Sequence, residues 1–139
     1  MRELVEDLMA HARRLGVQFA DVRIAEGAGT GVSVQDGVAD RVTTASARGG
    51  GVRVLVDGAW GFASTNNPTW DELRGCLEDA VSMARTASPS VSDPGMVADV
   101  EPVERQIITP CVEDPRGVPL AERVQAVYDL EKLARESDD

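Results

Sequence analysis

Residues 49–65 of this chain, GGGVRVLVDGAWGFAST, contain the pattern that most constrains its fold. The apolar, largely β-branched run Val52–Val56 is followed by Asp57-Gly58 and then by a second run, Ala59–Ser64. Asp-Gly between two such runs is typical of a two-residue type I′ turn, so the stretch predicts a β-hairpin. The turn also fixes the register, which pairs Val56 with Ala59, Leu55 with Trp60, Val54 with Gly61, Arg53 with Phe62 and Val52 with Ala63.

The two faces of this predicted hairpin differ. One face carries only valine, alanine and glycine, so a helix could lie close to it. The other face carries an arginine among large apolar side chains, namely Arg53, Leu55, Trp60 and Phe62. An arginine in an aromatic cluster suits a surface that another domain or subunit covers. The alternative is a half-solvated face on which Arg53 extends its charged end into water.

A second Asp-Gly turn, Asp36-Gly37, predicts another hairpin, formed by Thr30–Gln35 and Val38–Thr44. Phe19–Glu26 alternates apolar and charged residues, which is the pattern of a half-buried strand. The glycine-rich run Ser46–Gly51 reads as a flexible or bulged connection between the two hairpins. The first 64 residues are therefore expected to contain five strands.

Three amphipathic stretches predict helices. The first covers Glu3–Leu15, the second begins near Thr69 and ends before Ser88, and the third covers Leu120–Glu136. Thr69 and Glu72 have the spacing of a capping box. Alanines in the second helix would allow it to approach the Val/Ala/Gly face of the hairpin closely.

Residues 88–119 differ in composition, because they hold six of the seven prolines. The sequence thus predicts an α+β domain over residues 1–87, a Pro-rich arm or loop over 88–119, and a helix over 120–139 that is a truncated continuation of the same domain. The expected fold is a mainly antiparallel five-stranded sheet built from two hairpins, with two helices packed on it and a third, C-terminal helix.

Charge and hydropathy narrow the class of protein. A net charge of −10 argues against nucleic acid as a partner, since phosphate binding requires clustered Lys and Arg. No apolar run reaches the length that a membrane span needs, and the N-terminus does not resemble a signal peptide. These features lead us to expect a cytoplasmic protein without a membrane partner.

Few residues are candidates for catalysis. His11 is the single histidine, and Cys76 and Cys111 have no metal-ligand spacing, so we expect a structural histidine and two free thiols. The serines fall in turns and in the Pro-rich segment, which does not favour Ser/His/Asp catalysis. The sequence accordingly predicts no catalytic residue, no metal ligand and no cofactor in this chain.

The hairpin GVRVLVDGAWGFAST, preceded by an ADVR strand and an SVQDGVAD hairpin and followed by an Ala-rich helix, resembles the N-terminal domain of the TldD/PmbA family. Members of that family were named as modulators of DNA gyrase and are regarded as metallopeptidases. The resemblance runs from about Leu4 to Ala87, and Trp60-Gly61-Phe62 is more similar to TldD than to PmbA. It implies zinc in a full-length TldD-like protein, held by an HExxxH motif. These 139 residues lack that motif, so the chain alone is expected to be inactive.

The resemblance also implies a role in binding. In a TldD-like protein this domain helps to wall the chamber that leads to the zinc, and it contributes to contacts between paired subunits. The implied partners are a peptide or unfolded protein substrate and a TldD/PmbA-type subunit or a second copy of the chain. Two alternatives are a stand-alone non-catalytic interaction module and a gyrase-directed regulator that acts through protein contacts. The candidate contact residues are Arg53, Leu55, Trp60, Phe62, Ser64 and Thr65.

Overall fold

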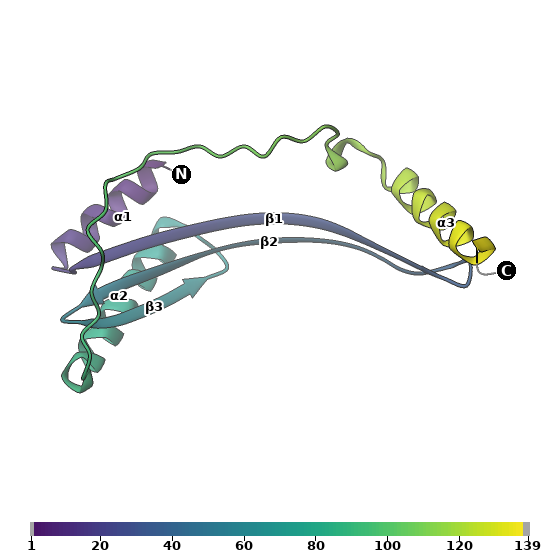
Figure 1. The fold of residues 1–139 in the computed structure, drawn as a ribbon. Coiled ribbons are helices and arrows are strands. Elements are labelled where there is room, and N and C mark those ends of the chain that lie inside the picture. Colours follow the sequence, from purple (N-terminus) through teal and green to yellow (C-terminus); the bar gives the residue numbers. More distant parts are fainter. Residues whose placement is uncertain (1, 138–139) are drawn as a thin grey trace. The chain divides into compact units, whose positions relative to one another are not determined.

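The computed structural model describes residues 2–137. Its main elements are α1 (Arg2–Arg14), β1 (Phe19–Gln35), β2 (Val38–Val56), β3 (Ala59–Thr65), α2 (Trp70–Ala87) and α3 (Leu120–Ser137), with short 3₁₀ helices at Ser88–Ser90 and Pro115–Gly117. The strands form one antiparallel sheet in the order β1-β2-β3 (Figure 1). The α+β class is confirmed.

The prediction of five strands is wrong. β1 continues without a break through the stretch between residues 26 and 30, and β2 continues through Ser46–Gly51, so both expected connections lie inside strands. Glycine weakens an isolated strand, but it does not prevent strand pairing. In β2 the glycine run is paired, because Gly50 lies opposite Thr65 and Gly51 opposite Ser64 on β3. Pairing across the sheet therefore overrides the local signal.

Both Asp-Gly turns form as expected. Asp57 and Gly58 have φ values of 48° and 76°, and Asp36 and Gly37 have φ values of 51° and 73°. Two consecutive positive φ angles define the type I′ turn that matches the twist of a hairpin. The predicted register between β2 and β3 is confirmed from the pair Val56 and Ala59 outward.

The described residues cluster into two compact units, one comprising residues 2–27 and 47–100 and the other residues 28–46 and 101–137. Every buried hydrophobic side chain found among the described residues belongs to the first unit. The core there joins α1, the inner face of β2 and β3, and α2. Its largest fully buried side chains are Leu8, Leu73, Leu77, Val52 and Val54.

Close approach between β3 and α2 depends on Gly61. A Cβ at this position would overlap the carbonyl oxygen of Ala80 and would lie 3.1 Å from the backbone nitrogen of Ala84. Both alanines are fully buried, so small residues on the helix meet a glycine on the strand. This confirms that the second predicted helix packs on the Val/Ala/Gly face (Figure 1).

The start of α2 has half of the expected capping box. Thr69 is the N-cap residue, and its Oγ1 accepts a hydrogen bond from the backbone N–H of Glu72 at 3.4 Å. The Glu72 carboxylate does not complete the box; it accepts a hydrogen bond from Thr65 Oγ1 at 3.4 Å. Glu72 thereby links the end of β3 to the first turn of the helix.

His11 connects α1 to α2. Its Nε2 lies 3.3 Å from Glu78 Oε1, and its Nδ1 lies 3.2 Å from Arg14 Nη2. The side chain is 19% exposed, which agrees with the expected partly buried, structural histidine.

The second unit is held by polar contacts between α3 and the Asp36-Gly37 turn. The backbone N–H of Gly37 donates to Glu131 Oε1 at 3.1 Å, and the backbone N–H of Ala39 donates to the Tyr128 hydroxyl at 2.8 Å. Within its described range α3 has no buried residue.

Candidate functional site

The sheet face that points away from α2 carries most of the predicted contact residues. Arg53 lies opposite Phe62 and Leu55 lies opposite Trp60, with Ser64 on the same face. Trp60 is 41% exposed and Phe62 is 55% exposed. Thr65 differs, because its Oγ1 turns towards Glu72 of α2.

Leu55 is covered by the segment that follows α2, and it is only 3% exposed. The backbone N–H of Gly95 donates to the carbonyl of Gly58 at 2.8 Å, which fixes this segment over the turn. A Cβ on Gly95 would lie 3.1 Å from Leu55 Cδ1 and 2.7 Å from Trp60 Nε1. Leu55 is therefore not part of the accessible surface.

Arg53 is held between a carboxylate and an aromatic ring. Its Nη2 donates a hydrogen bond of 2.5 Å to Asp21 Oδ2, and its Cζ lies 4.9 Å from the centre of the Trp60 ring. Its Nε is buried and has no hydrogen-bond partner among the described residues. Phe19 packs edge-on against Trp60, with ring centres 5.9 Å apart and an interplanar angle of 78°. The guanidinium is thus fixed in place.

A groove of about 520 Å³ lies beside this cluster. It is lined by residues from all three strands: Asp21, Arg23, Ala25, Gly49, Gly50, Gly51, Arg53, Phe62, Ser64 and Thr65. Four of the six predicted contact residues line it, and Trp60 and Leu55 lie outside it. The volume is in the range typical of small-ligand sites.

The sequence-based selection of site residues omitted β1. Phe19, Asp21 and Arg23 complete the cluster and the groove. The alternation of apolar and charged residues in this strand was the available signal, because it places these three side chains on one face. The position of β1 next to β2 could not be read from that alternation alone.

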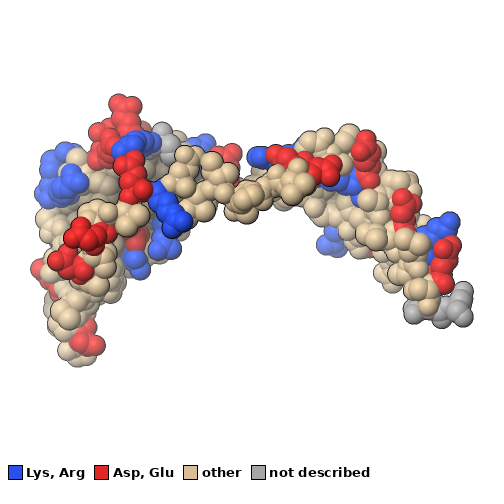
Figure 2. Space-filling model, turned by 45° about the horizontal axis from the view of Figure 1, so that its top comes forward, with Lys and Arg blue, Asp and Glu red and all other residues tan. Residues whose placement is uncertain are grey.

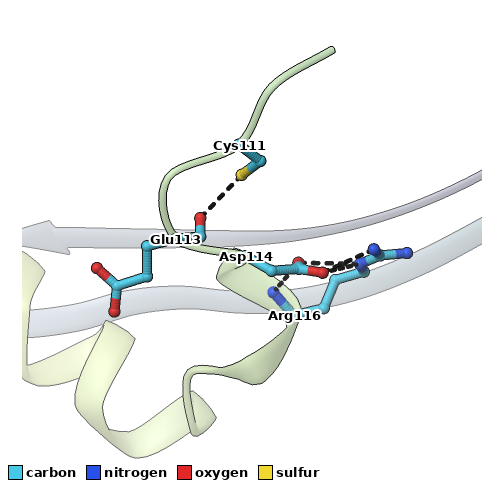
Figure 3. A network of polar contacts seen from close by, with 4 residues as sticks. All are labelled: Cys111, Glu113, Asp114 and Arg116. Atoms are coloured by element: carbon cyan, nitrogen blue, oxygen red, sulfur yellow. Dashed lines mark hydrogen bonds and ion pairs between the residues drawn. The ribbon is translucent and has the colours of Figure 1, made fainter. Parts of the chain in front are cut away.

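A second group of polar contacts lies before α3 (Figure 3). The Asp114 carboxylate accepts hydrogen bonds from the backbone N–H of Arg116 at 2.9 Å and from Arg116 Nη2 at 2.6 Å. The hydrogen bonds from Arg116 lower the pKa of Asp114 from 3.8 to about 2. The Cys111 thiol donates to the carbonyl of Glu113 at 3.0 Å. This arrangement caps a short 3₁₀ helix and contains no histidine or further nucleophile.

The other thiol, Cys76, is buried in α2. Burial raises its pKa, and the nearby charges of Asp79 and Glu72 raise it further. A raised pKa disfavours the thiolate, which is the reactive form of cysteine. Cys76 is accordingly a core residue.

Residues 2–137 contain no group of three or more His, Cys, Asp or Glu side chains that could hold a metal ion. The zinc that the resemblance implies therefore does not fit the residues described here. None of the described helices combines the length and hydropathy needed to cross a membrane. Acidic and basic side chains are interspersed on the face shown in Figure 2.

Comparison with known proteins finds related sequences. Residues 20–84 match the profile of PmbA/TldA metallopeptidase domain 1. A metalloprotease from Synechocystis is 33% identical over 122 residues, which cover 87% of this chain and 25% of that protein. The chain spans about a quarter of the length of this relative.

Two solved structures share the fold. TldE from Thermococcus kodakarensis is 21% identical, with a TM-score of 0.63 over 97% of this chain and 30% of that one. A protein from Bacteroides thetaiotaomicron, provisionally described as a modulator of DNA gyrase, is 22% identical, with a TM-score of 0.59 over 76% of this chain and 24% of that one. Residues 20–84 are therefore related to the first domain of the PmbA/TldD metallopeptidases, and the two solved structures share the fold of this chain.

Proposed function

We propose that this chain is the N-terminal, non-catalytic portion of a TldD-like metallopeptidase that degrades or processes unfolded peptides. In this proposal its exposed sheet face helps to form the substrate chamber and the contacts between paired subunits. The zinc and its ligands belong to a catalytic domain outside these residues, and the enzyme acts in the cytoplasm.

The observation that carries the proposal is the exposure of Trp60 and Phe62 around an ordered arginine. Trp60 and Phe62 keep 41% and 55% of their surface exposed, although Arg53, Asp21 and Phe19 fix the cluster in one geometry. Aromatic and arginine side chains are enriched where proteins bind each other. A rigid, exposed cluster loses little conformational entropy on binding, so it suits repeated contact with peptides.

The edge of the sheet offers a second contact. Among the described residues no strand lies beyond β3, so the outer N–H and C=O groups of Ala59–Thr65 have no strand partner. A peptide that adds to this edge would be held by main-chain hydrogen bonds, which carry little side-chain selectivity. This is the selectivity expected for unfolded substrates.

The test uses the complete protein from its native host. Its intact mass is expected to be several times 14.8 kDa. The protein is also expected to contain bound zinc and to hydrolyse unstructured peptides. Removing the ring with Trp60→Ala is expected to raise KM for peptide about tenfold, because a central aromatic contact is typically worth about 1–2 kcal/mol.

Met83→Ala is the matched control, because Met83 on α2 is 54% exposed and lies away from the cluster. A KM that is unchanged in Trp60→Ala, with folding intact, would contradict the proposed role of this face. A native product of 14.8 kDa without zinc would favour a stand-alone interaction module instead.

A further inference from the structure

The groove beside Arg53 has a floor of backbone. Gly49 and Gly51 place no side chain on this face of β2, and the Phe62 ring leans over Gly51, where a Cβ would lie 3.0 Å from Phe62 Cε2. Gly50 turns to the other face, where a Cβ would lie 2.8 Å from Leu73 Cδ2. The three glycines therefore leave a hollow next to an exposed ring, which can receive an apolar side chain.

The charged groups that line the groove are Asp21, Arg23 and Arg53. Asp21 is paired with Arg53, whereas the Arg23 side chain is exposed and has no hydrogen bond or ion pair with any described residue. The groove thus has an uncompensated positive charge in a chain whose net charge is −10. Such a local reversal of sign favours an anionic ligand.

We propose that this groove binds an acidic side chain of an extended peptide. Arg23 pairs with the peptide carboxylate, and a neighbouring apolar side chain of the peptide rests on Phe62 and the glycine floor. Guanidinium and carboxylate groups match in a planar, two-point geometry, which gives direction as well as attraction. This inference rests on the proposed function and narrows its substrates to peptides that combine acidic and apolar residues.

The test measures fluorescence polarisation of labelled hexapeptides with amidated C-termini. One peptide alternates leucine and glutamate, and the other alternates leucine and glutamine. The purified protein is expected to bind the glutamate peptide about twofold to fivefold more tightly, as for one solvent-exposed ion pair with good geometry. Arg23→Gln is expected to abolish this preference, and Arg23→Lys to restore part of it.

Arg48→Gln is the matched control, because Arg48 is an exposed arginine on the same sheet that does not line the groove. A loss of the preference in Arg48→Gln as well would overturn the inference, since overall charge would then explain it. Equal binding of both peptides to the unsubstituted protein would also overturn it. If Phe62→Ala then weakened the binding of both peptides by the same factor, the sheet face would still bind peptides as proposed, but without recognising their charge.

Discussion

Gly61 is the residue on which the packing of β3 against α2 depends. Gly61→Ala would drive a methyl group into the Ala80 carbonyl, which is backbone and cannot move without shifting the helix. Overpacking of this kind typically costs about 1–3 kcal/mol, so we expect the free energy of unfolding to fall by that amount. Urea unfolding of the purified protein measures the change.

Gly75→Ala provides the matched control. Gly75 lies inside α2, and a Cβ there would meet nothing within 4 Å. Alanine is favoured over glycine in a helix by about 0.5–1 kcal/mol, so this substitution is expected to stabilise the protein. Equal effects of the two substitutions would show that α2 does not lie on Gly61 in solution.

The titration of the Asp114 carboxyl group gives a second prediction at the scale of single residues. Its pKa is lowered from 3.8 to about 2 by hydrogen bonds from Arg116, so the folded state holds the ionised form more strongly than the unfolded state does. The contribution of this contact is therefore fully present above about pH 4 and is lost as the pH falls through about 2. We expect the Asp114 carboxyl resonance to titrate near pH 2 by NMR.

Arg116→Gln removes the charged partner, so the midpoint is expected to return towards 3.8. Arg105→Gln, a change of the same kind in an exposed arginine of the preceding segment, is expected to leave the midpoint unchanged. If Asp114 titrates near its ordinary value in the unsubstituted protein, the contact shown in Figure 3 does not form in solution.

At the scale of elements, the two Asp-Gly turns share a backbone geometry and differ in their surroundings. Gly58→Ala would impose a left-handed φ of +76° on alanine and would also place its Cβ 2.7 Å from Pro94 Cβ. Gly37 has a similar φ of +73°, but the Cβ added by Gly37→Ala would meet the flexible end of the Arg135 side chain. Both are expected to destabilise their turns by about 1 kcal/mol from strain. We expect a further loss of about 1–3 kcal/mol from overpacking in Gly58→Ala alone.

Hydrogen exchange at the amides around each turn tests this difference. The amides of Val56 and Ala59 are expected to lose more protection in Gly58→Ala than those of Gln35 and Val38 lose in Gly37→Ala. The opposite order would mean that the segment around Pro94 does not lie over the Asp57-Gly58 turn.

Turns and register could be predicted because short-range chemistry determines them. Asp-Gly selects the type I′ turn, and the turn in turn fixes which residues of β2 and β3 are partners. Strand length could not be predicted in the same way. The Ser46–Gly51 stretch has poor strand propensity, but it lies inside β2, which is hydrogen-bonded to β1 on one side and, at Gly50 and Gly51, to β3 on the other. That pairing is a long-range effect, which no local pattern records.

The same division holds for the candidate site. Arg53 and Trp60 could be placed together, since they lie on one face of a hairpin whose register was known. The sequence predicts that Asp21 and Arg23 lie on a half-buried strand. The contact of Asp21 with Arg53, and the place of Arg23 in the groove, depend on which strand lies beside β2. The cover over Leu55 depends on Gly95, forty residues along the chain.

At the scale of the whole molecule, stability is unevenly distributed. The buried side chains found among the described residues lie in the unit formed by residues 2–27 and 47–100, while α3 and the 28–46 hairpin contribute none. Burial of apolar surface is the main favourable term in folding. The first unit should therefore fold on its own contacts, whereas the second depends on polar contacts that water competes for.

Limited proteolysis tests this difference in stability between the two units. Residues 96–117 are all exposed, and proteases cut exposed extended segments before they cut helices or paired strands. Trypsin is expected to cleave first after Arg105, before the exposed arginines within α1 and α2. Because the core contains none of the residues beyond this cut, the slow hydrogen exchange of the α2 and β3 amides is expected to persist in the fragment that ends at Arg105.

Arg105→Gln should abolish the first cut, which mass spectrometry of the digest would reveal. Fast exchange throughout the fragment would mean that the core requires the C-terminal helix, despite the absence of that helix from the core cluster.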